Sequence, residues 1–120
     1  MEKLNILIVE DDPVSMRRLS SDVKKLGHKP FEADDAIEAL AIYTKDFAMD
    51  MVITDLQLPM SSGADLIRSI RKMSLDIPII VVSGTINADT FKLIKKLNCA
   101  DILVKPYDRK RLVALIEKEC

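Results

Sequence analysis

The sequence has few cysteine, glycine and aromatic residues. Its 120 residues include two cysteines, three glycines, no tryptophan and a single histidine, His28. Cys99 and Cys120 are too few for a disulfide framework or a multi-cysteine zinc site, which favours a reducing compartment. One histidine excludes a multi-histidine metal centre or a histidine-based catalytic triad formed by this chain alone. His28 follows Gly27 in a predicted turn, and we expect its side chain to be exposed.

An excess of one charge sign and a long hydrophobic run are also missing. Lys and Arg number 18 against 19 Asp and Glu, which gives a net charge of −1. No overall positive field therefore attracts a nucleic-acid backbone or an anionic membrane. The apolar run near the start of the chain stops at Glu10 and is too short for a signal sequence or a membrane span. We expect a cytoplasmic protein with no direct nucleic-acid partner and no membrane partner.

Short apolar runs alternate with amphipathic stretches along the whole chain. Hydrophobic residues make up 48% of the sequence and no linker or repeat interrupts it, so a single domain is expected over residues 1–120. Several runs are apolar at successive positions and rich in Val and Ile, as in parallel strands covered on both faces. The predicted strands are residues 4–9, 29–32, 51–54, 77–82 and 102–104.

Between these runs the sequence carries helix start and stop signals. Asp12 followed by Pro13, Asp35 followed by Glu38, and Asp108 are typical of helix N-termini. Gly27 and Asn98, which tolerate a left-handed backbone, are expected to end the first and fourth helices. The expected apolar stripes are Met16, Leu19, Val23 and Leu26; Ile37, Leu40 and Ala41; Leu66, Ile67, Ile70 and Met73, after Gly63; Phe91, Ile94 and Leu97; and Leu112, Leu115 and Ile116.

The order strand–helix therefore occurs five times. This pattern predicts an α/β fold of the doubly wound, flavodoxin-like type: a (βα)5 three-layer sandwich with a five-stranded parallel sheet. Ligands bind such sheets at the carboxyl ends of the strands. The residues that directly follow each strand are therefore the first candidates for a functional site.

Charged and polar residues occupy four of these strand ends. Glu10 and Asp11 follow the first strand, Asp55 the third, Ser83 the fourth and Lys105 the fifth. Neighbouring carboxylates about 4 Å apart repel each other by about 4 kcal/mol at an effective dielectric of about 20. A hard divalent cation offsets this repulsion, and Mg²⁺ suits a site with few carboxylates and an incoming phosphate.

The same residues are equipped to receive a phosphoryl group. Asp55 stands alone at the end of the central strand and is the best nucleophile, whereas Glu10 and Asp11 can share the metal ion. A metal ion and the Lys105 ammonium would stabilise charge on the phosphoryl oxygens, with the Ser83 hydroxyl close by. The product would be an acyl phosphate on Asp55.

Four motifs in the right order make the chain resemble a response-regulator receiver domain over nearly all of its length. They are the sequence from Val9 to Pro13 (VEDDP), the sequence from Asp55 to Pro59 (DLQLP) with Gly63 after it, Val82-Ser83-Gly84, and Lys105-Pro106. The resemblance implies a regulatory phosphoacceptor domain of a two-component phosphorelay rather than an enzyme.

The resemblance also implies a role for each matching residue. Asp55 would be the phosphoacceptor, Ser83 the switch hydroxyl and Lys105 the phosphate contact. Mg²⁺ would be held by Glu10, Asp11, Asp55 and the backbone carbonyl of Gln57, and the Lys105–Pro106 bond would be cis.

The resemblance implies partners as well. A histidine kinase or phosphotransfer protein would donate the phosphoryl group. The surface formed by the helix that carries Phe91, the strand 102–104 and the helix after Asp108 would then switch and bind a downstream effector or a second copy.

Three features depart from the family pattern. Ile102 stands where the family usually has the aromatic residue coupled to the switch, and we expect Tyr107 to serve packing rather than to replace it. Arg111 and Leu115 do not match the charge pattern by which one transcription-factor subfamily dimerises. Cys99 stands where the family often has alanine and is expected to be a small buried group.

Three alternatives belong to other classes. A degenerate receiver would act only as a protein-binding module and would never take a phosphoryl group. A phosphatase of the haloacid dehalogenase type would need an Asp-x-Asp pair after the first strand, where Glu10 holds the first position. A flavin carrier would need a phosphate loop rich in glycine and hydroxyl groups after that strand, where three acidic residues stand instead.

Overall fold

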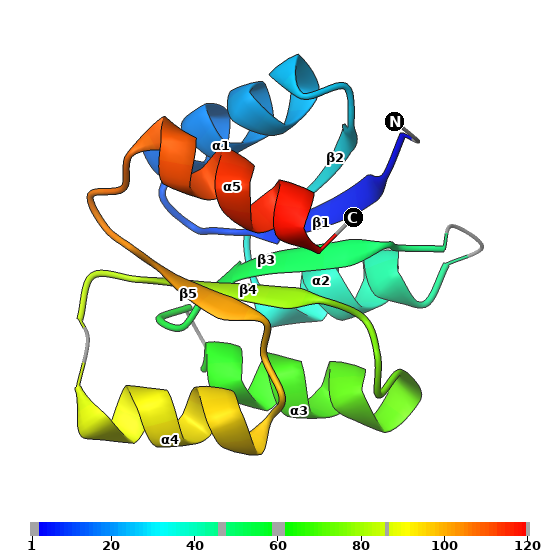
Figure 1. Cartoon of the computed structure of the whole chain (residues 1–120). Helices are drawn as coiled ribbons and strands as arrows, with labels where there is room; N and C mark the ends of the chain where they lie inside the picture. The colour runs from blue at the N-terminus through cyan, green and yellow to red at the C-terminus, as the bar shows by residue number, and fades with distance from the viewer. Residues whose placement is uncertain (1–2, 46–47, 59–61, 86, 120) are drawn as a thin grey trace.

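Five parallel strands form one sheet in the order β2-β1-β3-β4-β5 (Figure 1). The computed structural model describes residues 3–45, 48–58, 62–85 and 87–119. Every strand pair is parallel, as predicted from the runs of Val and Ile. The strands are β1 (Asn5–Val9), β2 (Lys29–Ala33), β3 (Met51–Asp55), β4 (Ile79–Ser83) and β5 (Asp101–Val104).

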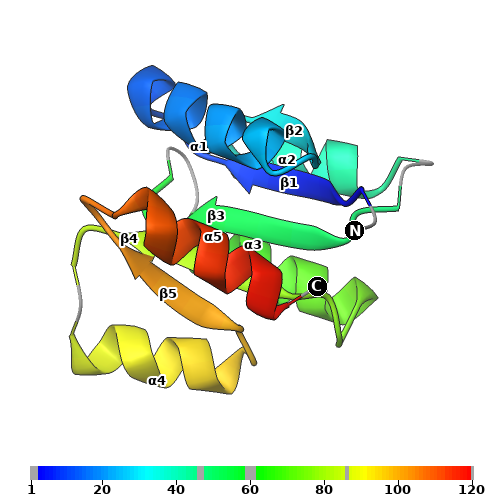
Figure 2. The same cartoon turned by 45° about the horizontal axis from the view of Figure 1, so that its top comes forward.

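Helices cover both faces of the sheet. Helices α1 and α5 lie on one face and α2, α3 and α4 on the other (Figures 1 and 2). This three-layer arrangement confirms the predicted fold class. The helices are α1 (Pro13–Lys25), α2 (Ala36–Tyr43), α3 (Gly63–Met73), α4 (Ala88–Lys96) and α5 (Arg109–Lys118).

The sheet divides the hydrophobic core into two layers. Along β1, Ile6 and Ile8 pack with residues of α1 and α5, whereas Leu7 and Val9 pack with residues of α2 and α3. This alternation follows from the two-residue period of a strand. All four side chains are at most 1% exposed, and burying each one stabilises the fold by about 1.5–3 kcal/mol.

The helix termini follow the predicted signals closely. The side chains of Asp12, Asp35 and Asp108 cap α1, α2 and α5 by accepting backbone N–H bonds. Gly27 has a φ of 90° and Asn98 a φ of 54°, so both adopt the left-handed conformation that was expected where their helices end.

Several side chains lie differently from what the sequence predicted. His28 is only 4% exposed, because its Nδ1 atom accepts a hydrogen bond of 3.1 Å from the backbone N–H of Leu4. Ile37 is 67% exposed, and Met73 and Phe91 are each 50% exposed.

For α2 the predicted face was wrong. The buried residues are Ala36 and Ala39, while Ile37 and Ala41 are exposed. The helix has apolar residues on all sides, so its periodicity does not fix which face meets the sheet.

No helix within the described ranges has both the length and the apolar character that crossing a bilayer requires. The cytoplasmic location expected from the sequence stays a prediction.

Candidate functional site

Three carboxylates meet at the carboxyl edge of the sheet. Glu10 directly follows β1 and Asp55 ends β3, and these two strands are neighbours, with Val9 paired to Thr54. One oxygen from each of Glu10, Asp11 and Asp55 lies within 4.8 Å of the others. The predicted convergence of these side chains is therefore confirmed, and we call this group the acidic pocket.

Lys105 reaches into the acidic pocket from the end of β5. Its Nζ atom lies 2.5 Å from Oε1 of Glu10 and 2.9 Å from Oδ2 of Asp55. One ammonium faces three carboxylates, so the fully ionised pocket keeps an excess of two negative charges. A divalent cation would balance that excess.

Burial and charge shift the pKa values of the two central partners. Burial raises the pKa of Glu10, and the nearby charge of Asp55 adds to this, although the hydrogen bond from Lys105 opposes it. Burial alone would lower the pKa of Lys105, but its hydrogen bonds to Glu10 and Asp55 outweigh burial and raise it. Lys105 is therefore firmly cationic at neutral pH.

Hydrogen bonds fix the orientation of the Asp55 carboxylate. Its Oδ1 atom accepts the backbone N–H of Gln57 at 2.9 Å and its Oδ2 atom accepts from Lys105. Asp55 is only 9% exposed. The backbone nitrogen of Gln57 thus lies directly beside the carboxylate, and the role of the Gln57 carbonyl as a metal ligand stays a prediction from the resemblance.

Gly63 allows the chain after β3 to fold back onto Asp55. Its N–H donates a 2.8 Å bond to the carbonyl of Leu56. A Cβ atom at this position would lie 2.1 Å from the carbonyl oxygen of Asp55 and 2.7 Å from the Cα of Leu56. Only glycine fits here without a backbone shift. The sequence also places Met60 in the loop after Asp55, where partial exposure near the site is expected, and this residue falls outside the described residues.

Ser83 lies at the same edge of the sheet, and its hydroxyl bonds to the adjacent loop. The Oγ atom donates to the carbonyl of Thr85 at 2.9 Å and accepts the N–H of Thr85 at 3.1 Å. Ser83 is 5% exposed. Its role as a switch hydroxyl stays a prediction.

The donor set of the acidic pocket fits a hard divalent cation. Its ligand atoms are carboxylate oxygens, which Mg²⁺ prefers over nitrogen or sulfur. Glu10, Asp11 and Asp55 would hold the ion, and Mg²⁺ bound there would supply positive charge to an incoming phosphoryl group.

Three further residues belong to the surroundings of Lys105. The Lys105–Pro106 bond is cis, as the resemblance implied. Tyr107 is buried at 9% exposure, which confirms its expected packing role. Arg18 of α1, which the sequence did not single out, stacks on the Tyr107 ring at 4.4 Å. No sequence signal marks this contact, because the two residues are 89 positions apart.

Comparison with known proteins identifies relatives across the whole chain. The family model described as "Response regulator receiver domain" matches residues 6–117. The DNA-binding transcriptional regulator NtrC of Azospirillum brasilense is 31% identical over 118 residues, which cover 98% of this chain and 24% of NtrC. The cell cycle transcriptional regulator CtrA of Caulobacter vibrioides is 26% identical over 94% of this chain and 48% of CtrA. The chain therefore spans between about a quarter and a half of the length of these two relatives.

Solved structures agree with this result. A response regulator receiver protein from Pseudomonas putida is 33% identical, with a TM-score of 0.89 and 98% of each chain covered. The non-phosphorylated HemR receiver domain from Leptospira biflexa is 28% identical, with a TM-score of 0.90, and the match covers 98% of this chain and 94% of that one.

Proposed function

The chain belongs to the response regulator receiver domain family, and from this membership we propose that Asp55 accepts a phosphoryl group from a phosphohistidine. The donor would be a histidine kinase or a phosphotransfer protein. The observation that carries the proposal is the acidic pocket, in which Asp55 contacts the Lys105 ammonium while Glu10 and Asp11 stand within 4.8 Å. The family consists of regulatory phosphoacceptor domains and not of catalytic enzymes, which sets aside the phosphatase alternative.

In the proposed step an Asp55 oxygen attacks the phosphorus in line with the leaving nitrogen. The new O–P bond forms as the N–P bond of the phosphohistidine breaks, and the imidazole keeps the electron pair and takes up a proton. Before the reaction Lys105 pairs with two carboxylates. During the reaction its ammonium would move toward the phosphoryl oxygens and stabilise the negative charge that develops on them. The Mg²⁺ held by Glu10, Asp11, Asp55 and the Gln57 carbonyl would supply further positive charge.

The phosphorylated state would then favour a second arrangement of the surface formed by α4, β5 and α5. In this proposal the Ser83 hydroxyl leaves Thr85 and bonds to the phosphoryl group. Such contacts shift the population only as far as they differ in strength between the two states.

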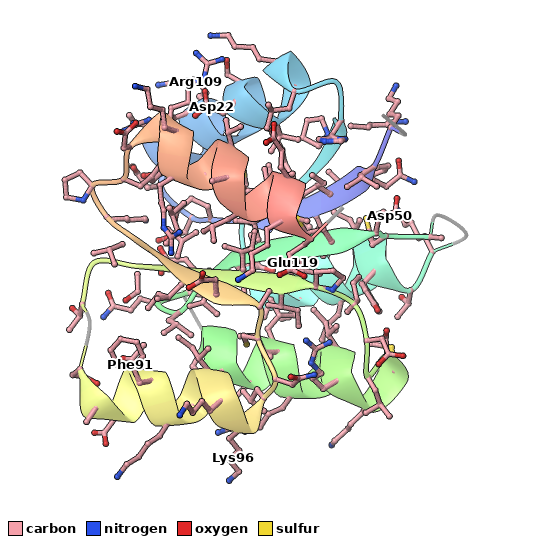
Figure 3. The ribbon with its side chains drawn as sticks, in the orientation of Figure 1. Asp22, Asp50, Phe91, Lys96, Arg109 and Glu119 are labelled. Carbon is pink, nitrogen blue, oxygen red and sulfur yellow. The ribbon has the colours of Figure 1, made fainter. Side chains whose placement is uncertain are left out.

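The surface formed by α4, β5 and α5 has the features of a binding site for a downstream effector or a second copy. A groove of about 500 Å³ runs along it, lined by residues that include Phe91, Ile102 and Arg111. Figure 3 shows Phe91 on the side of α4 that faces the sheet. Ile102 is 8% exposed and packs in the core layer on that face, so the exposed aromatic ring of this groove comes from α4 rather than from β5. Arg111 pairs with Asp101 of the same chain at 3.2 Å.

Acetyl phosphate with Mg²⁺ provides a direct test. Intact-mass spectra should show one added phosphate on the wild type and none on Asp55→Asn. Asp76→Asn is the matched control, because Asp76 is an exposed carboxylate in the turn before β4. Wild-type protein that gains no phosphate from acetyl phosphate or from a phosphohistidine donor would favour the degenerate binding module instead.

A further inference from the structure

The turn that carries Lys105 is held in place from α1. The guanidinium of Arg18 stacks on the Tyr107 ring at 4.4 Å, and its Nη2 atom donates a 2.8 Å hydrogen bond to the backbone carbonyl of Tyr107. Arg18 therefore contacts both the side chain and the backbone of Tyr107, which lies two positions after Lys105. Nearby, Arg109 at the start of α5 pairs with Asp22 of α1 at 3.4 Å (Figure 3).

Apart from its contacts with Glu10 and Asp55, the Lys105 side chain borders open space. It is 28% exposed and borders a hollow of about 290 Å³, which Ser15, Arg18, Pro106 and Tyr107 also line. On one side the backbone of Lys105 is tied to β4 through its N–H, which donates to the carbonyl of Ser83 at 2.8 Å. On the other side Pro106 has no N–H to donate. The next anchored residue along the chain is Tyr107, whose ring packs in the core layer beneath α1 and α5.

We propose that Arg18 is a positioning residue for the phosphoacceptor site, which by fixing Tyr107 holds the Lys105 ammonium where it meets both Asp55 and the incoming phosphoryl group. This inference rests on the proposed function. It assigns Arg18 no contact with the phosphoryl group. Its effect reaches the site only through the backbone of residues 105–107.

The chemistry of arginine suits this role. A planar guanidinium can stack on an aromatic ring and donate an in-plane hydrogen bond at the same time, whereas a lysine ammonium provides a single point charge on a flexible stem. Lysine at position 18 should therefore restore only part of the effect. A simpler possibility is that Arg18 merely stabilises the contact between α1 and the turn, and the experiment must separate the two.

Binding of two different ligands to the acidic pocket distinguishes a positioning role of Arg18 from a purely stabilising one. Binding of Mg²⁺ by itself requires only the carboxylates. Binding of the phosphoryl mimic beryllofluoride, measured in excess Mg²⁺, also requires Lys105. Arg18→Met keeps most of the aliphatic stem and should weaken beryllofluoride binding by about three- to ten-fold. The same variant should leave the Mg²⁺ dissociation constant within about two-fold of the wild-type value, because the carboxylates that hold the ion keep their places at the ends of β1 and β3 and Lys105 keeps its charge. Arg17→Met is the matched control, since Arg17 is an exposed residue of the same helix, and it should change neither constant.

A double-mutant cycle tests the route through Lys105. In a Lys105→Met background, Arg18→Met should cause no further loss of beryllofluoride affinity, because the group that it positions is gone. Additive losses would overturn the proposal, and so would equal weakening of Mg²⁺ and beryllofluoride or unchanged binding of both.

A measurement on the protein without any ligand tests the inference independently of the proposed function. In NMR spectra, exchange of the Lys105 ammonium protons with water should be several-fold faster in Arg18→Met than in wild type or Arg17→Met, because loosened contacts to Glu10 and Asp55 protect them less. Unchanged exchange would overturn the positioning role. A wild-type protein that shows this protection but takes no phosphoryl group or mimic would instead overturn the proposed function.

Discussion

Gly63 shows at the scale of one residue how the site constrains the sequence. A methyl group there would overlap the carbonyl oxygen of Asp55 and the Cα of Leu56, both of which are backbone atoms that cannot rotate away. The chain after β3 would have to shift, and Asp55 with it.

We predict that Gly63→Ala lowers the free energy of unfolding by about 1–3 kcal/mol, the usual cost of overpacking a tight site. Urea denaturation measures this change. Gly84→Ala is the matched control, because a Cβ atom at Gly84 meets no atom of the described residues within 4 Å, and its stability should stay close to wild type. Equal stability of the two variants would contradict the close approach of Gly63 to Asp55.

Single residues of the pocket were predictable where strand ends determine their position. Glu10 and Asp55 had to meet because β1 and β3 are neighbouring parallel strands that end at the same edge. His28 was not predictable in this way. Its burial arises only once β1 and the turn after α1 lie side by side, where its Nδ1 atom accepts the N–H of Leu4.

At the scale of elements, α4 is anchored mainly through its C-terminal end. Ile94, at 8% exposure, is the buried residue of α4. Arg71 of α3 donates to the carbonyls of Leu97 and Asn98, each at 2.8 Å, and also to the carbonyl of Ile77 at 2.8 Å. One guanidinium thus joins the end of α4 to the turn before β4.

We predict that Arg71→Met lowers the free energy of unfolding by about 2–3 kcal/mol, because it leaves part-buried carbonyls without their charged donor. Amide hydrogen exchange near Asn98 and Cys99 should also accelerate. Arg68→Met is the control, since Arg68 lies on the same helix but forms only an exposed ion pair with Asp65, which is worth about 0.5 kcal/mol or less. Equal losses in the two variants would contradict the anchoring role of Arg71.

The elements themselves were predictable to within a few residues, and the reason is local. Caps such as Asp12 and Asp108 and terminators such as Gly27 and Asn98 act on the turn next to them, so the sequence around each one is sufficient. The contacts that join elements are not local. Arg71 and Leu97 are 26 positions apart, and nothing in the sequence near either residue indicates that they meet.

At the scale of the whole molecule, five repeats of strand and helix with short connections predicted a parallel, doubly wound sheet, and the structure adds the strand order β2-β1-β3-β4-β5. The same topology concentrates negative charge at one edge of the sheet. The net charge of the chain is only −1, yet three carboxylates share a space of 4.8 Å around one ammonium. The folded state therefore carries a local repulsion that the unfolded chain lacks, because unfolding separates β1 from β3.

A cation that binds this edge must stabilise the entire fold, since the unfolded chain offers no such pocket. By linkage, Mg²⁺ at a ten-fold excess over its dissociation constant should add about 1.4 kcal/mol to the free energy of unfolding. Thermal or urea unfolding in MgCl2, compared with NaCl of equal ionic strength, measures this gain. Asp11 is exposed, so Asp11→Ala should fold normally and, without Mg²⁺, should be as stable as wild type or slightly more stable.

The same variant should lose most of the gain from Mg²⁺, whereas Asp76→Ala, which changes an exposed carboxylate away from the pocket, should keep it. If Mg²⁺ stabilised Asp11→Ala as much as wild type, the ion would be acting elsewhere on the surface. The repulsion among Glu10, Asp11 and Asp55 would then be offset by Lys105 alone.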